Sequence, residues 1–379
     1  MKFIISSSEL LAYLQALNKV VPSRSIVPLV ENFLFEISSD GLKITATDLE
    51  TTLIARLELD NIEGEGKVAI ESKRLLDILK EFSQQPLTFE INDENFEVVI
   101  KSESGKYSIP GNSHVDEFPE HAEISADIAS SFVISSEILK KGINSTFFSI
   151  SDDDLRPVMN GIYMELKPDG LTFVSSDSHK LVRYRRNDFT SEKEASFILA
   201  KKPADLLRNI LAKLDDDVKV EFDDRNAIFE LSSYTVVCRL IEGNFPDYEA
   251  VMPKNNDKMV NIDKNNFHNT IKRVSLFANE ASKLVKFYFH ENEAEISAQD
   301  IDFSISAFEK INCLYDQEPI KIGFKSTFLL DIMQNLDATD ISLTMTDPKR
   351  AALVFPTQME DSKEDIVMLV MPMMLDEDE

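Results

Sequence analysis

The sequence predicts an α+β protein made of three repeated domains, each with two helices packed on antiparallel sheet. Three observations lead to this fold class. A similar pattern returns roughly every 125–130 residues. Each copy holds two amphipathic segments with helical spacing, and each ends in alternating apolar segments that are typical of half-buried strands. Helices and strands grouped in this way fit α+β better than α/β.

The repeat is clearest in one strand-like segment. Residues 41–48 (GLKITATD) recur as residues 170–177 (GLTFVSSD) and, more weakly, as residues 294–300 (AEISAQD). Apolar positions alternate in all three, as in a strand with one buried face. Each copy also opens with a strand that runs into a helix, at residues 3–10, 132–139 and 260–267.

Apolar residues spaced one, three and four apart predict six helices, two in each copy. They span residues 9–20, 72–82, 135–144, 201–214, 263–274 and 325–336. A short apolar strand precedes the second helix of each copy, and a pair of alternating strands follows it. Those pairs are residues 87–91 with 96–100, 218–222 with 227–231, and 341–345 with 352–355.

Length and repeat spacing together divide the chain into domains. A chain of 379 residues is too long for one ordinary core and suits two or three domains of roughly 100–150 residues. Polar or proline-flanked stretches separate the copies. We therefore predict domains at residues 1–129, 130–257 and 258–379.

Composition favours a reduced, cytoplasmic protein. The two cysteines, Cys238 and Cys313, are too few for a disulfide framework and have no zinc or redox spacing, so we expect reduced thiols in the core. The N-terminus has no unbroken apolar stretch of the kind that a signal peptide needs, and no run approaches transmembrane length. We expect a cytoplasmic protein without a membrane partner.

Charge is distributed unevenly along the chain. The 40 Lys and Arg against 67 Asp and Glu give a formal net charge of −27, which disfavours indiscriminate binding to anionic polymers. The six predicted helices nevertheless carry +7, so the rest of the chain carries −34. These helices would attract phosphate if they share one side of an assembly; the alternative is ordinary solvated helix faces. The residues that supply most of this charge are Lys73, Arg74, Lys140, Lys141, Lys201, Lys202, Arg208, Lys213, Lys272 and Arg273.

Signals for catalysis are weak. Residues 64–67 lack the spacing and hydroxyl residue of a phosphate-binding loop, and the five histidines lack the close pairing of helical zinc sites. Two aspartate runs, Asp152–Asp154 and Asp215–Asp217, could hold Mg²⁺ for phosphoryl transfer. They fall where loops are expected, however, and fit solvated acidic turns better. We expect no catalytic residue, no metal and no cofactor.

Five short runs, in order and in register with the three copies, resemble one family. They are Thr47–Glu50 (TDLE), Arg156–Gly161 (RPVMNG), Asp177–Leu181 (DSHKL), Gly243–Tyr248 (GNFPDY) and Val370–Met373 (VMPM). Together with the three-copy plan, they resemble the beta subunit of bacterial DNA polymerase III, the bacterial sliding clamp family, over essentially the whole chain. The resemblance implies a non-catalytic processivity subunit that holds the replicative polymerase on duplex DNA.

The same resemblance implies that two chains close head-to-tail into a ring of six similar domains, with helices around the hole and sheets outside. Double-stranded DNA would be encircled without sequence readout. A head-to-tail contact joins two different surfaces, and the resemblance places Tyr107 and Ile109 of one chain against Leu276 and Phe277 of the other. The DNA-facing residues that we expect are Arg24, Lys73, Arg74, Lys140, Lys141, Arg156, Lys201, Lys202, Arg208, Lys272 and Arg273.

The resemblance further implies a hydrophobic cleft beside the third domain that takes short linear peptides. The implied partners are the DNA polymerase III catalytic subunit, the clamp-loader complex, and other polymerases and repair proteins. Flexible methionines suit such varied partners. The cleft residues matched by motif are Met159, Ser176, His179, Lys180, Leu181, Pro246, Val251, Phe328, Leu369, Val370, Met371, Pro372 and Met373.

Three positions near this cleft depart from the family pattern. Ser178 stands where glycine is common, Lys180 where arginine is common, and Met374 where a C-terminal arginine is common. Fewer guanidinium donors at the rim predict a different preferred peptide. Two other functions stay open from the residues alone: a metal-dependent phosphoesterase that uses the aspartate runs, and a repeat scaffold that binds proteins but no DNA.

Overall fold

The computed structural model describes residues 1–59, 61–124, 129–191 and 194–375, and the chain forms two compact units. Unit 1 consists of Met1–Lys140 with Lys202–Leu240, and unit 2 of Lys141–Lys201 with Ile241–Glu379. The middle repeat therefore contributes to both units. Strands pair antiparallel in the sheets of both, as the sequence predicts.

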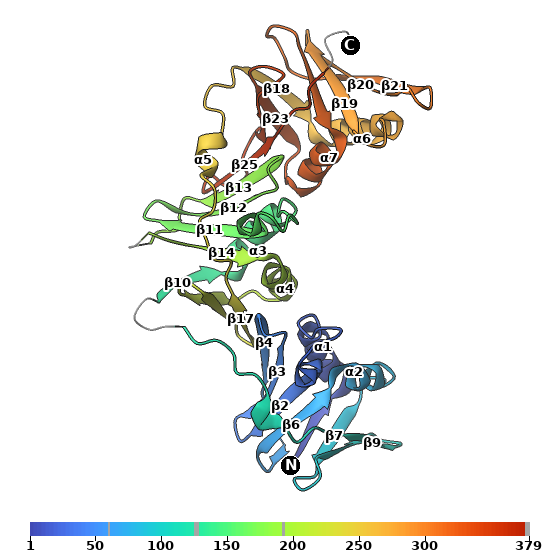
Figure 1. The fold of residues 1–379 in the computed structure, drawn as a ribbon, viewed down its shortest axis with the longest axis vertical. Coiled ribbons are helices and arrows are strands. Elements are labelled where there is room, and N and C mark those ends of the chain that lie inside the picture. Colours follow the sequence, from blue (N-terminus) through green and yellow to red (C-terminus); the bar gives the residue numbers. More distant parts are fainter. Residues whose placement is uncertain (60, 125–128, 192–193, 376–379) are drawn as a thin grey trace. The chain divides into compact units, whose positions relative to one another are not determined.

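Unit 1 holds a five-stranded and an eight-stranded sheet (Figure 1). Strands β17 and β4 pair from Tyr234↔Ala55 to Cys238↔Thr51, so the larger sheet runs from the first repeat into the second. The smaller sheet has the order β5 (Ile62–Glu63), β1 (Lys2–Ser6), β7 (Pro86–Ile91), β8 (Glu97–Lys101) and β9 (Lys106–Pro110). The larger sheet has the order β10 (Ser130–Ser135), β15 (Asp217–Phe222), β16 (Asn226–Glu230), β17 (Tyr234–Arg239), β4 (Thr51–Leu57), β3 (Gly41–Thr47), β2 (Asn32–Ser38) and β6 (Gly66–Glu71).

Unit 2 holds an eight-stranded and a four-stranded sheet. Strands β13 and β25 pair from Lys180↔Val370 to Arg186↔Glu364, so this larger sheet joins the second repeat to the third. Its order is β14 (Ala195–Ala200), β11 (Gly161–Lys167), β12 (Gly170–Ser176), β13 (Lys180–Arg186), β25 (Glu364–Val370), β24 (Ala352–Pro356), β23 (Asp340–Met345) and β18 (Lys258–Asp263). The smaller sheet has the order β21 (Ile305–Asn312), β20 (Glu293–Asp300), β19 (Leu284–His290) and β22 (Ile320–Lys325).

All six predicted helices are present, with ends that differ by a few residues. They are α1 (Ser7–Leu17), α2 (Ser72–Lys80), α3 (Ser136–Phe147), α4 (Lys201–Leu211), α6 (Lys264–Val274) and α7 (Ser326–Asn335). Helix α4 stops three residues before the predicted 214, just ahead of the acidic run Asp215–Asp217, because acidic charge is unfavourable at the negative end of a helix. The sequence did not predict the short α5 (Tyr248–Val251) or the 3₁₀ turns η1 (Pro28–Glu31), η2 (Val115–Glu117), η3 (Pro157–Met159) and η4 (Ser275–Phe277).

Apolar faces of the helices pack into the sheets as their spacing predicts. Helix α1 buries Leu10, Leu14 and Leu17, and each fully buried leucine contributes about 1.5–3 kcal/mol. Figure 1 shows α1 and α2 side by side, and α6 and α7 likewise.

Both cysteines are free and buried, and burial raises the pKa of Cys313 to about 11 and of Cys238 to about 12. They are therefore neutral core thiols.

Gly142 marks a close approach between α3 and β12. A Cβ at this position would lie 2.6 Å from the Phe173 ring. Alanine favours a helix interior by about 1 kcal/mol over glycine, but overpacking costs roughly 1–3 kcal/mol. We expect Gly142→Ala to lower the free energy of unfolding, measured by chemical denaturation. Asn144→Ala, at an exposed site of the same helix, is the control and should not destabilise; equal effects of the two substitutions would contradict the packing argument.

Candidate peptide-binding surface and DNA-facing helices

The turn between β12 and β13 positions His179. The Asp177 carboxylate accepts hydrogen bonds from the backbone N–H groups of His179 (2.9 Å) and Lys180 (2.8 Å) and pairs with the Lys180 ammonium at 2.8 Å. Burial acts to raise the pKa of Asp177, but these donors outweigh it and hold the pKa below its ordinary value. The turn stays fixed as long as Asp177 is ionised.

Ser178, inside this turn, takes the left-handed conformation with φ 75°. Glycine adopts that conformation without steric cost, which explains why glycine suits the position. The serine hydroxyl instead accepts a hydrogen bond from the Arg156 guanidinium. Arg156 also donates to Asp153 at 2.8 Å. The guanidinium of Arg156, which is predicted to face DNA, therefore forms hydrogen bonds within the chain beside this turn.

The ends of β13 and β25 bring distant parts of the predicted cleft together. Leu181 and Leu369 face each other across the two strands. Both belong to one buried cluster with Tyr248 of α5, and the N–H of Met371 donates to the His179 carbonyl at 2.8 Å. Residues from the second repeat, the third repeat and the segment between them thus meet at one place.

Phe328 of α7 lies against the same turn. Its ring stacks on His179 with centroids 5.6 Å apart. The ammonium groups of Lys180 and Lys325 each lie 5.1 Å from its centroid, a distance at which a cation is attracted to a ring. Phe328 is therefore held in place by three neighbours.

The exposed fractions of the predicted cleft residues divide them into a surface layer and a buried layer. Val251 is 55% and Met371 38% exposed, whereas Lys180 is only 7% exposed. The buried members of the predicted set lie beneath the surface, because they belong to or pack on the eight-stranded sheet: Met159, Ser176, Lys180, Leu181, Leu369 and Val370. The exposed and half-exposed members, which we call the peptide surface, are His179, Pro246, Val251, Phe328, Met371, Pro372 and Met373.

The predicted DNA-facing residues fall into two groups. Seven form ion pairs within the chain: Arg74, Lys141, Arg156, Lys201, Lys202, Arg208 and Arg273. Four have no ion pair with any residue that the structure describes: Arg24, Lys73, Lys140 and Lys272. The six long helices still carry eleven Lys and Arg against five Asp and Glu, a net +6 close to the predicted +7.

Two of the paired lysines have a structural role. The ammonium of Lys202 donates to the Val20 carbonyl at 3.0 Å and pairs with Asp48. Lys141 lies 2.6 Å from Glu364, a carboxylate only 8% exposed that also pairs with Arg186. Each ammonium is thus already engaged by acceptors of the chain itself, and the carboxylates concerned are largely shielded from solvent. We therefore do not assign a DNA contact to Lys141 or Lys202.

The predicted subunit contacts lie at two sheet edges or beside them. Tyr107, on the edge strand β9, is 42% exposed and packs edge-on against Phe82 with ring centroids 5.2 Å apart. Ile109 is only 6% exposed, because it faces into its own sheet. Leu276 and Phe277 in η4 are 76% and 38% exposed.

Sequence reasoning missed further apolar surface beside η4. Ile301 and Phe303 in the β20–β21 turn are 71% and 74% exposed, and Phe308 on the edge strand β21 is 56% exposed. The sequence contains a signal for this apolar surface, since Ile301 and Phe303 stand in the otherwise polar run Asp300–Ser304. Exposed apolar residues at a strand edge are typical of an interface.

Models of one known family match the chain in three consecutive segments. They describe the N-terminal, central and C-terminal domains of the DNA polymerase III beta subunit, at residues 1–122, 133–247 and 249–374. The chain belongs to the DNA polymerase III beta subunit family.

Relatives of this family match over the full length. The Beta sliding clamp of Haemophilus influenzae is 28% identical over 378 residues, which cover 99% of this chain and 100% of the relative. The Beta sliding clamp of Escherichia coli is 25% identical over 376 residues, with the same coverage. A DnaN sliding clamp from Pseudomonas aeruginosa bound to griselimycin gives a TM-score of 0.93 at 24% identity, covering 99% of this chain and 100% of that one.

These matches confirm the family, the α+β fold of three clamp domains and the non-catalytic sliding-clamp function predicted from the sequence. The phosphoesterase alternative loses its support. Asp152 pairs with Lys201 and Asp153 with Arg156, and neither aspartate run belongs to a group of three metal donors in the described parts of the chain.

Two departures from the DNA polymerase III beta subunit pattern differ in their consequences. Lys180 points its ammonium at Asp177 and lies 3.5 Å from Asp331, so this lysine lies below the rim. The expectation that the exchange of arginine for lysine changes the preferred peptide stays a prediction. Met374 is 68% exposed. It places apolar surface next to the peptide surface where the family often has a cation.

Proposed function

We propose that two copies of this chain close head-to-tail into a ring that encircles double-stranded DNA and tethers the replicative polymerase to it. The family match across all three repeats carries the proposal. Charge supports it, because the helices are positive in a chain of net −27. Helices around the hole would attract phosphate without reading bases, and the acidic remainder would repel DNA.

The basic residues that are exposed and without an ion pair are the best candidates for phosphate contact. Lys73 on α2 and Lys272 on α6 are both exposed. Each phosphate contact adds about 0.9 to the slope of log affinity against log salt. We expect the double variant Lys73→Ala with Lys272→Ala to reduce that slope for a short duplex by about 2. The assembled dimer loses four lysines, two from each chain, but only some of them contact the DNA at once.

A matched control removes the same charge elsewhere. Lys254 and Lys349 are exposed and lie outside the helices, so Lys254→Ala with Lys349→Ala should leave the slope unchanged. Fluorescence anisotropy at several salt concentrations measures both variants. An equal loss in the two would mean that only net charge matters, and no loss in either would favour a scaffold without DNA binding.

We further propose that partner proteins dock on the peptide surface through short apolar segments. The DNA polymerase III catalytic subunit, the clamp-loader complex, and other polymerases and repair proteins are the proposed partners. Support comes from Val251, Met371 and Met374, which are exposed apolar residues above a fixed, buried base. The apolar Met374 favours partner segments with an apolar rather than an acidic residue at that end.

We infer that the chain acts in the cytoplasm. Its relatives carry the name of a replication protein. Within the described ranges, no helix is both long and apolar enough to cross a membrane.

A further inference from the structure

A tight hairpin between β19 and β20 brings one histidine and two glutamates to one face of the four-stranded sheet. His290 pairs with Glu293 across the strands, and Glu295 lies two residues further along β20, on the same face. The turn residues Glu291 and Asn292 have φ 45° and 64°, as in the two-residue turns that suit hairpins. The three side chains are thus held on a rigid scaffold.

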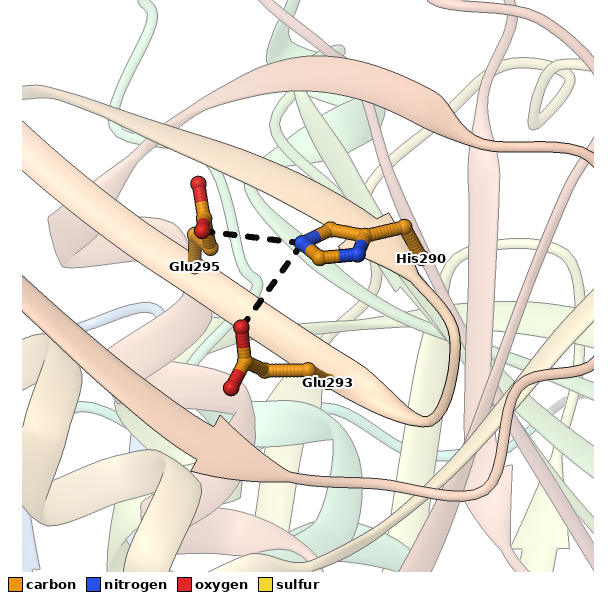
Figure 2. Close-up of side chains that lie close together, drawn as sticks. All are labelled: His290, Glu293 and Glu295. Carbon is orange, nitrogen blue, oxygen red and sulfur yellow. Dashed lines mark ion pairs between the residues drawn. The ribbon is translucent and has the colours of Figure 1, made fainter.

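Nε2 of His290 points between the two carboxylates (Figure 2). It lies 3.7 Å from Oε1 of Glu293 and 3.6 Å from Oε1 of Glu295, which is too far for a hydrogen bond. This buried nitrogen has no hydrogen-bond partner among the residues that the structure describes. The three donor atoms lie within 4.8 Å of one another. Donors bound at about 2.0–2.2 Å to one tetrahedral Zn²⁺ stand ~3.3–3.6 Å apart, so the two distances from His290 are close to those in a zinc site.

We propose that His290, Glu293 and Glu295 bind a Zn²⁺ ion. Imidazole nitrogen and carboxylate oxygen are both zinc ligands, and water would complete the tetrahedron. The sequence contains this site as the spacing His290-x-x-Glu293-x-Glu295. A search for closely paired histidines alone does not find such a spacing. The site shares no residue with the peptide surface or the DNA-facing set, so it does not rest on the proposed function.

Lys310 competes for the same oxygens. It stands opposite Glu295 on β21, and its ammonium lies 2.7 Å from Oε1 of Glu293 and 2.6 Å from Oε1 of Glu295. The side chain is 47% exposed, so it can turn into solvent when an ion arrives. Lys310 neutralises the carboxylates in the metal-free protein, and its removal should therefore strengthen metal binding.

Zinc titration of the full-length protein, first stripped of metal with a chelator, tests the site. Competition with a chromophoric zinc indicator should show one equivalent per chain. We expect His290→Ala to weaken binding at least ten-fold and Lys310→Met to strengthen it several-fold. His114→Ala is the matched control, because His114 pairs with the single carboxylate of Glu117 on an exposed turn, and it should titrate like the unmodified chain.

Cobalt gives a second readout of the same site. Co²⁺ should develop the intense visible absorption of a tetrahedral complex in the unmodified chain and not in His290→Ala, with circular dichroism showing that both are folded. Absence of a stoichiometric zinc site in the unmodified chain overturns the proposal, whatever Lys310→Met does. Unchanged affinity in His290→Ala overturns it equally.

Discussion

Replacing Phe277 with aspartate is expected to convert the dimer into monomers of 43.0 kDa. Phe277 and its neighbour Leu276 present apolar side chains that are 38% and 76% exposed, and the exposed residues of the β20–β21 turn extend this surface. Burying a carboxylate in the subunit contact without a partner costs several kcal/mol, even after relaxation and water penetration. Since about 1.4 kcal/mol changes a dissociation constant ten-fold, the dimer should be lost at micromolar concentration.

Multi-angle light scattering measures the mass directly. Ile26→Asp is the control, because Ile26 is 100% exposed and lies outside the predicted contact, and it should remain dimeric. A Phe277→Asp protein with the mass of the unmodified dimer would show that the interface lies elsewhere. Loss of the dimer in both variants would point to a general effect of added charge.

Met371→Ala with Met373→Ala should weaken partner-peptide binding about 10- to 100-fold while leaving the dimer intact. A few side chains near the centre of an interface dominate its affinity, and truncating one of them costs about 2 kcal/mol or more; we expect the two methionines to belong to this group. Met371 is anchored through its backbone N–H to His179, and Met373 through its N–H to Gly323 at 2.8 Å, so the backbone should keep its path when the side chains are shortened.

Fluorescence anisotropy with a labelled clamp-binding peptide of the polymerase catalytic subunit gives the affinity. Met259→Ala provides the control, since Met259 is 45% exposed on β18, apart from the peptide surface. Equal affinity of the double variant and the unmodified chain would remove these methionines from the binding site. Loss of affinity together with loss of the dimer would instead indicate a folding defect.

Secondary structure could be predicted closely because three copies of one pattern supported each other. Local periodicity predicted the six long helices to within a few residues. It could not show that β17 pairs with β4, or β13 with β25, because the sequence separation of these strands leaves no periodic signal. The sheets that cross the repeats, and the two units that result, therefore emerged only from the structure.

The candidate sites show the same limit. Charge counting located the positive helices, but Lys202 finds its partner Asp48 in a different repeat, and no count over a helix reveals that pairing. Motif matching collected the peptide residues without separating exposed Met371 from buried Lys180, since burial depends on strands that the motif does not contain. The cluster around His290 was accessible from spacing alone, because its donors lie within six consecutive residues.

Release from DNA ends tests the central claim most directly. The protein would be loaded with clamp loader and ATP onto a nicked circular plasmid, and the DNA would then be linearised. The proposed ring should stay on the circle and leave the linear DNA through its ends. Equal retention on both forms would contradict encirclement and leave an ordinary DNA binder.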